Sequence, residues 1–152
     1  MQIRKATVAD IDLLIKLRID YLLEENKVQS LQDAEDIEKK LHDYFEKWIP
    51  NGNFIAFLAG DGGDIYSAAF LSIVERPPRT AASYLVGTVY NVFTYPPYRR
   101  KGIATKVMRV LLEEAKLLGV VSVDLLATED GKPLYEKLGF QIADYTSMRI
   151  KL

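Results

Sequence analysis

A basic stretch that follows two prolines constrains the fold of this chain more than any other feature. Ser83 to Thr94 is rich in β-branched and aromatic residues and predicts a strand, which Pro96-Pro97 must end. Arg99-Arg100-Lys101 then leads directly into a helix predicted from Gly102 to Leu118. The unpaired N–H groups and the positive dipole end of a helix N-terminus favour a phosphate. Since Gly102 and Ala104 are small, the backbone there can approach a pyrophosphate closely, and the stretch predicts an anion-binding turn.

Two short patterns resemble the signatures of the GNAT-superfamily N-acetyltransferases. Arg99-x-x-Gly102-x-Ala104 is similar to the R/Q-x-x-G-x-G/A segment of that family, and Pro96-Pro97-Tyr98 resembles its usual lead-in. Pro133-Leu134-Tyr135-Glu136-Lys137-Leu138-Gly139-Phe140 looks like the second signature, L-Y-x-x-x-G-F. Both occur in the order of the family, with a helix and a strand predicted between them. The resemblance covers the chain from about Leu85 to Ile142.

Composition narrows the classes of protein that this chain can belong to. Its 152 residues, of which 49% are hydrophobic, fit one globular domain over residues 1–152. The absence of cysteine excludes disulfides, and with His42 as the single histidine we expect no metal site. A net charge of -1 gives no reason to expect nucleic acid as a partner. Without an apolar run of ~20 residues or a signal-peptide pattern, we expect a cytoplasmic protein with no membrane partner.

The order of the predicted elements is βααβββαβαββ. Strands are predicted at 1–7, 53–59, 65–74, 83–94, 120–127, 140–143 and 147–152, and helices at 8–25, 33–48, 102–118 and 130–138. Gly60-Asp61-Gly62-Gly63 is interpreted as a hairpin turn, since no Gly-Lys-Ser/Thr follows to make a phosphate loop. This mixed order predicts an α/β fold with helices on both faces of the sheet. The GNAT resemblance implies that the sheet splays between its fourth and fifth strands, where the thioester arm of the cofactor enters.

The resemblance also implies acetyl-CoA as cosubstrate and assigns residues to it. Main-chain atoms of Val92, Phe93 and Thr94 are expected to position the pantetheine arm, and one amide of this segment to stabilise the oxyanion. Thr128 stands where many relatives have Asn, so its contact with the cofactor is left open. The pyrophosphate is expected on the basic turn and the first helical turn, which consist of Arg99, Arg100, Lys101, Gly102, Ile103, Ala104 and Thr105.

Tyr135 is the expected general acid, because an unperturbed tyrosine with a pKa near ~10 stays protonated at neutral pH and can protonate a leaving thiolate. The general base is harder to assign. Some relatives use a glutamate on the fourth strand, but Ser83 to Thr94 contains no carboxylate. The remaining candidates for the general base are Glu75, at the end of the preceding strand, and a water relay.

The resulting functional hypothesis is direct transfer of an acetyl group from acetyl-CoA to the primary amine of a small molecule or peptide. The acidic region from Ile19 to Trp48 is expected to form one wall of the acceptor pocket and to attract a cationic amine. The alternative is a catalytically silent sensor or scaffold that binds acyl-CoA through the same fold. Binding of single-stranded RNA is disfavoured because the basic run is short, and a homodimer is left open.

Overall fold

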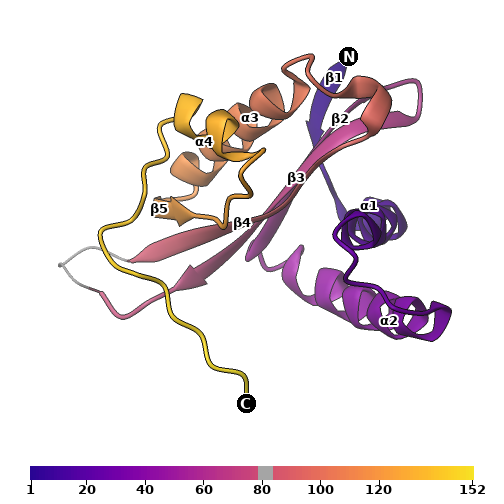
Figure 1. Cartoon of the computed structure of the whole chain (residues 1–152), viewed down its shortest axis with the longest axis horizontal. Helices are drawn as coiled ribbons and strands as arrows, with labels where there is room; N and C mark the ends of the chain where they lie inside the picture. Colours follow the sequence, from indigo (N-terminus) through magenta and orange to yellow (C-terminus); the bar gives the residue numbers. More distant parts are fainter. Residues whose placement is uncertain (79–83) are drawn as a thin grey trace.

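A mixed five-stranded sheet forms the centre of the molecule, with helices on both of its faces (Figure 1). The structure is a computed structural model that describes residues 1–78 and 84–152. The strands lie in the order β1 to β5, and the bounds of the strands are β1 Gln2–Lys5, β2 Phe54–Asp61, β3 Asp64–Glu75, β4 Leu85–Thr94 and β5 Val120–Asp124. The helices are η1 Val8–Asp10, α1 Ile11–Glu24, α2 Leu31–Trp48, η2 Pro96–Tyr98, α3 Ile103–Leu117 and α4 Lys132–Lys137.

The first four strands pair antiparallel with their neighbours, while β5 runs parallel to β4. Asp61 pairs with Asp64 across the turn between β2 and β3, and Gly62 and Gly63 supply its positive φ angles of 57° and 97°. The predicted hairpin is therefore confirmed. Pairing of β4 with β5 ends at Thr88 and Asp124, so that β4 continues from Val89 to Thr94 without a strand on this side among the described residues. The predicted splay between the fourth and fifth strands is confirmed as well.

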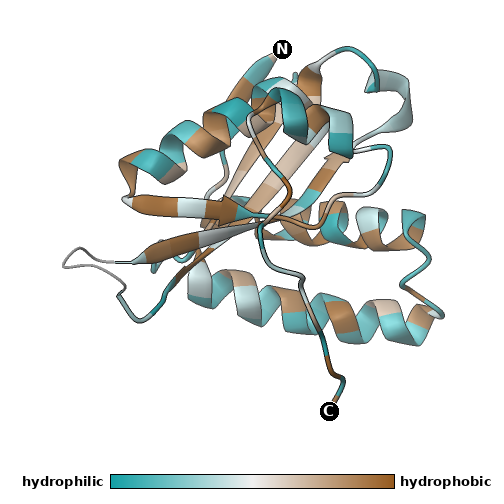
Figure 2. Ribbon diagram, turned by 60° about the vertical axis from the view of Figure 1, so that its left-hand side comes forward, coloured by the Kyte–Doolittle hydropathy of each residue, from teal (hydrophilic) through white to brown (hydrophobic). Residues whose placement is uncertain are grey.

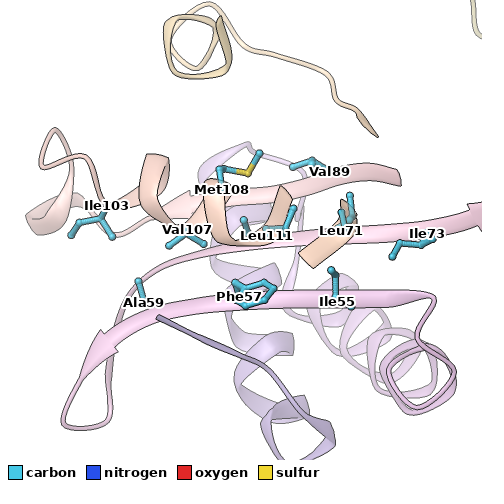
Figure 3. Packing of buried hydrophobic residues seen from close by; sticks show 12 residues of the cluster. Ile55, Phe57, Ala59, Leu71, Ile73, Val89, Ile103, Val107, Met108 and Leu111 are labelled. Atoms are coloured by element: carbon cyan, nitrogen blue, oxygen red, sulfur yellow. The ribbon is translucent and has the colours of Figure 1, made fainter. Parts of the chain in front are cut away.

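Two apolar cores lie against the two faces of the sheet. On one face, α3 packs Ile103, Val107, Met108 and Leu111 onto β2, β3 and β4 (Figure 3). On the other, α1 and α2 cover residues of β2, β3 and β4, with Phe45 of α2 among aromatic rings of the sheet. The helices that cover the sheet contain both apolar and polar residues, as the mixed colours along their ribbons in Figure 2 show. None of the helices in the described residues combines the length and the apolar character needed to cross a membrane.

A β-bulge interrupts the pairing of β3 with β4 and lies within the part of β4 that extends beyond β5. Ala68 pairs with Phe93 but Phe70 pairs with Tyr90, so Asn91 and Val92 face a single residue of β3. Asn91 is buried and has a φ of 54°, a conformation that Asn tolerates better than most residues. Its side-chain amide donates to the Leu17 carbonyl of α1 at 3.3 Å. The bulge is thereby fixed to the helix that covers this face.

The C-terminal part of the chain differs from the prediction. Residues 140–152 form no strand in the described structure, and Figure 1 shows them as an extended segment that leaves the sheet. A strand needs a partner for its N–H and C=O groups, and local residue preference does not supply one. β5 is also not the buried central strand that its apolar sequence predicted, since it lies at the edge of the sheet with Val121 55% exposed. Ser83, the predicted first residue of β4, lies outside the described residues.

Asp10 joins β1 to the first helical turn, and its removal provides a test of the fold. Its carboxylate accepts two hydrogen bonds from Arg4, at 2.6 and 2.9 Å, and one from the Thr7 amide at 2.8 Å. The hydrogen bond from Arg4 is the main cause that lowers the pKa of Asp10 from 3.8 to about 2. Because the folded-state pKa lies below the unfolded value, the stabilisation is present above about pH 4 and is lost as the pH falls toward 2.

Asp10→Asn is therefore expected to lower the free energy of unfolding at neutral pH by about 1 kcal/mol, a capping effect plus a solvent-screened ion pair. Denaturant unfolding of both proteins at several pH values measures the difference, which should shrink below pH 4. Asp12→Asn, a change of an exposed carboxylate two residues away, serves as the control. A difference between wild type and Asp10→Asn that does not change with pH would contradict this account.

Candidate active site

A cavity of about 600 Å³ opens where β4 parts from β5. Three parts of the chain line it in addition to the end of β4: the C-terminal end of α1, the turn into α3, and α4. From α1 and β4 come Tyr21, Glu24, Glu25, Val92, Phe93 and Thr94; from the turn and α3 come Tyr98, Arg99, Arg100, Gly102, Ile103, Ala104 and Thr105; the remainder are Asp130, Gly131, Pro133, Leu134, Tyr135 and Lys137. The two signature regions, which are far apart in sequence, thus face one another.

The N-terminus of α3 forms one side of this cavity and is prepared to bind an anion. Gly102 is the N-cap residue, with a φ of 72° that favours glycine, and it cannot provide a capping side chain. No side chain of the described residues caps this helix, and its first turn contains no acidic residue. The first N–H groups of α3 therefore remain available, and Arg100, with a φ of 61°, turns the preceding loop. These features fit the diphosphate of a CoA-type cosubstrate.

The loop before α3 is held by its own side chains. The rings of Tyr66 and Tyr98 stack with centroids 4.0 Å apart, which anchors η2 on β3. Arg99 donates from Nε to the Thr94 carbonyl at 2.7 Å, and its Nη2 contacts both carboxylate oxygens of Glu24 at 2.6 and 2.8 Å. One guanidinium thus connects α1, the end of β4 and the anion-binding turn.

The unpaired end of β4 forms the floor of the cavity. On the opposite side of this segment, the buried Ser67 hydroxyl donates to the Phe93 carbonyl at 2.9 Å and lies 2.8 Å from the Thr94 hydroxyl. The end of β4 is therefore fixed from β3, while its other edge faces the cavity. An extended ligand could pair with this edge as an added strand does.

Two tyrosines approach the cavity from opposite walls, Tyr21 from α1 and Tyr135 from α4. Burial, followed by a hydrogen bond to the Glu25 carboxylate, raises the pKa of Tyr21 to about 12. Burial also raises the pKa of Tyr135. Both hydroxyls therefore remain protonated at neutral pH, since burial disfavours a charged phenolate. The Tyr135 ring rests edge-on against Phe140, with centroids 5.9 Å apart, which holds it in place.

The structure brings together most of the residues predicted for the site, but not all of them. Glu75 lies at the far end of β3, opposite Leu85, whereas the cavity is at the Thr94 end of β4. Over the intervening residues of β3 this is a separation of roughly 25 Å, so the geometry does not support Glu75 as the base. Because β3 and β4 are antiparallel, the end of β3 lies beside the beginning of β4, whereas the cavity lies at the end of β4.

Two residues predicted to bind the cofactor lie outside the lining of this cavity. Thr128 instead starts the turn into α4, where its hydroxyl accepts a hydrogen bond from the Gly131 amide at 3.1 Å. Lys101 places its ammonium group 5.7 Å from the centroid of the Tyr98 ring. Tyr21 is one residue of the cavity to which sequence reasoning gave no role of its own. Its position four residues before Glu25 on a helix is the signal that would have paired the two.

Comparison with known proteins agrees with this geometry. The profile of the acetyltransferase (GNAT) family matches residues 18–140. A predicted acetyltransferase from Clostridium acetobutylicum, solved with acetyl-CoA, is 31% identical with a TM-score of 0.84, over 97% of this chain and 95% of that one. An acetyltransferase from Trypanosoma brucei is 25% identical with a TM-score of 0.69, over 99% of each chain. The fold is that of the GNAT acetyltransferases.

A GCN5-related N-acetyltransferase from Ralstonia eutropha JMP134 shares the fold at 22% identity, with a TM-score of 0.79 over 98% of this chain and 97% of that one. No match was found among curated protein sequences. The chain belongs to the GNAT acetyltransferase family. The resemblance inferred from the two signatures is thereby confirmed, and so is the α/β fold class, apart from the two C-terminal strands.

Proposed function

We propose that this protein transfers an acetyl group from acetyl-CoA directly to a primary amine. The observation that supports this most is one cavity that combines the uncapped N-terminus of α3, the unpaired end of β4 and the hydroxyl of Tyr135. In the reaction, the amine nitrogen forms a bond to the thioester carbonyl carbon and the carbon–sulfur bond breaks. One proton leaves the nitrogen and one joins the sulfur, so the products are an N-acetyl amine and CoA.

Acetyl-CoA would supply the activated acyl group, and residues of this chain would hold it. The free amides at the start of α3, with Arg100 beside them, suit the diphosphate, and the open edge of β4 suits the amide groups of the pantetheine arm. A backbone N–H of the Val92–Thr94 segment is the proposed donor to the developing oxyanion. Because these donors are fixed by Ser67 and by the bulge at Asn91, they need little rearrangement as the charge develops.

The two tyrosines divide the movement of protons between them. Tyr135 donates its proton to the departing sulfur, a role that its raised pKa favours at neutral pH. The Tyr21 hydroxyl can donate to the Glu25 carboxylate while its oxygen accepts a hydrogen bond from the incoming amine. The Glu25 carboxylate then attracts the ammonium form and takes its proton through Tyr21. This assignment replaces Glu75 with a carboxylate that lines the cavity.

The proposal predicts release of free CoA thiol when acetyl-CoA and an amine are both present. Wild-type protein should release thiol with a suitable amine at a rate at least about 10²-fold above that without enzyme. Thiol release together with mass spectrometry of the acceptor measures it across a panel of amines. Tight binding of CoA, with no N-acetyl product from any amine of the panel, would instead assign the protein as a silent acyl-CoA sensor.

A further inference from the structure

A second, smaller cavity of about 270 Å³ lies between α1, α2 and the sheet. Aromatic side chains dominate its lining: Tyr44 and Phe45 from α2, Phe54 from β2, Phe70 from β3 and Tyr90 from β4. The single charged residue among its lining residues is Arg18 of α1. Tyr44 and Tyr90 are 36% and 46% exposed, so the cavity is open to ligands from outside.

Arg18 is a partly buried cation that makes few polar contacts with the described residues. Among the described residues, no carboxylate lies within ion-pair distance of its guanidinium. Within the part of the chain that the structure describes, its guanidinium makes one hydrogen bond, from Nη1 to the Asn91 side-chain oxygen at 3.3 Å, and the Tyr21 ring lies 5.4 Å away. Burial lowers the pKa of the Arg18 guanidinium, and the electrostatic influence of Tyr21 and Glu25, which acts in the opposite direction, does not cancel this effect. A partly buried cation of this kind is best satisfied by an anion.

Arg18 lines this small cavity and stands close in sequence to Tyr21 and Glu25, which line the active-site cavity. Arg18, Tyr21 and Glu25 follow one another at helical spacing on one face of α1, and the electrostatic influence of both Tyr21 and Glu25 reaches Arg18. Between Arg18 and Glu25 the helix rises by about 10 Å. An amine bound at Tyr21 and Glu25 would therefore lie about 10 Å along the helix axis from Arg18. The Tyr21 ring would lie between the amine and the guanidinium.

We infer that the small cavity binds an anionic group of the acceptor, with Arg18 as its counter-ion. The inference rests on the proposed function and narrows it to amines whose other end carries a carboxylate or phosphate, separated from the amine by an apolar spacer. Glu25 attracts the ammonium end, Arg18 the anionic end, and the aromatic lining accepts the spacer. The expected acceptor therefore carries opposite charges at its two ends.

A panel of matched amines tests this selectivity. It contains 6-aminohexanoate, 6-aminohexyl phosphate, 1-aminohexane and 1,6-diaminohexane, with glycine as the acceptor too short to span both groups. For wild type, kcat/KM for the better of 6-aminohexanoate and 6-aminohexyl phosphate should exceed that for 1-aminohexane by about 10- to 100-fold. This is the usual contribution of a hydrogen bond to a charged group. The two anionic amines show which of carboxylate and phosphate the cavity prefers.

Arg18→Met keeps most of the side-chain volume and removes the charge. It should reduce kcat/KM for the preferred anionic amine by at least about 10-fold more than for 1-aminohexane. Arg18→Lys should restore part of the preference, and Arg109→Met, a change of an exposed arginine on α3, should leave it intact. A wild-type enzyme that does not distinguish 1-aminohexane from the anionic amines would overturn the inference. So would an Arg18→Met variant that loses activity equally toward all amines, since Arg18 would then serve only to hold the bulge at Asn91.

Equilibrium binding of the same panel to the protein saturated with CoA separates this inference from the proposed function. If the protein prefers anionic amines through Arg18 but shows no turnover, the anion site is supported and the proposed transferase activity is rejected. If the protein acetylates amines without preferring anionic ones, the transferase activity is supported and the anion site is rejected. If no member of the panel binds or is acetylated, the inference is rejected.

Discussion

Gly102→Glu is expected to weaken CoA binding by more than about 100-fold, the largest loss that we predict for a single substitution. Gly102 has a φ of 72°, so any side chain is strained there, and a glutamate adds a negative charge at the helix N-terminus where the diphosphate should bind. The new carboxylate would itself be stabilised by the free amides and would compete for them. Calorimetric titration with CoA measures the loss.

Gly119→Glu provides a matched control at the other end of the same helix. Gly119 has a φ of 84°, so the substitution introduces comparable backbone strain and the same charge, but away from the cavity. It should lower the stability of the protein and leave CoA affinity within about twofold of wild type, because surface charges at this distance are screened. Equal CoA affinities for the two variants would remove the basis for placing the diphosphate on α3.

Tyr135→Phe should lower kcat by about 10²-fold while CoA affinity and thermal stability stay near those of wild type. The hydroxyl makes no hydrogen bond to the described residues, so its removal leaves no partner unsatisfied. The edge-on contact with Phe140 depends only on the ring and is retained. Single-turnover kinetics with a good amine acceptor measure the chemical step.

The pH dependence gives a second measure of the same role. Since burial raises the pKa of Tyr135 above its ordinary value of 10.0, the wild-type kcat should not decline on account of this group below pH 10. Tyr145→Phe, a change of a tyrosine that is 88% exposed, is the control and should be fully active. Full single-turnover activity of Tyr135→Phe would assign the proton to water or to another residue.

Local sequence was sufficient for the anion-binding turn, because its features depend on neighbouring residues. Pro96-Pro97 ends a strand, Gly102 allows a positive φ, and the apolar spacing after it specifies α3. The order of helices and strands through α4 could be predicted for the same reason, since each element is specified by residues close together in the sequence. The splay of β5 from β4 came from the family resemblance and agrees with the observed register.

The errors and the features that were not predicted concern relations between segments that are distant in sequence. Glu75 was placed near the site by its position at a strand end, but the register of β3 against β4 takes it to the opposite end of the sheet. Residues 140–152 have apolar residues typical of strands, yet strand formation also requires an edge with which to pair. The bulge depends on Asn91, whose tolerance of positive φ is a weak signal in one sequence. Arg18 acquires its importance only when α1 is packed against the aromatic cavity.

The contacts of Arg99 restrict how this enzyme can change its substrate during evolution or design. Glu24 lines the cavity, in the part of α1 that we propose faces the acceptor, and it also holds the guanidinium that is bonded to the end of β4. Replacing Glu24 to accept a differently charged amine would release Arg99 and is expected to disturb the turn proposed to bind the cosubstrate. We therefore expect selectivity and cosubstrate affinity to be coupled at this position, and variation of the acceptor to be easier at residues that Arg99 does not touch, such as those around Arg18.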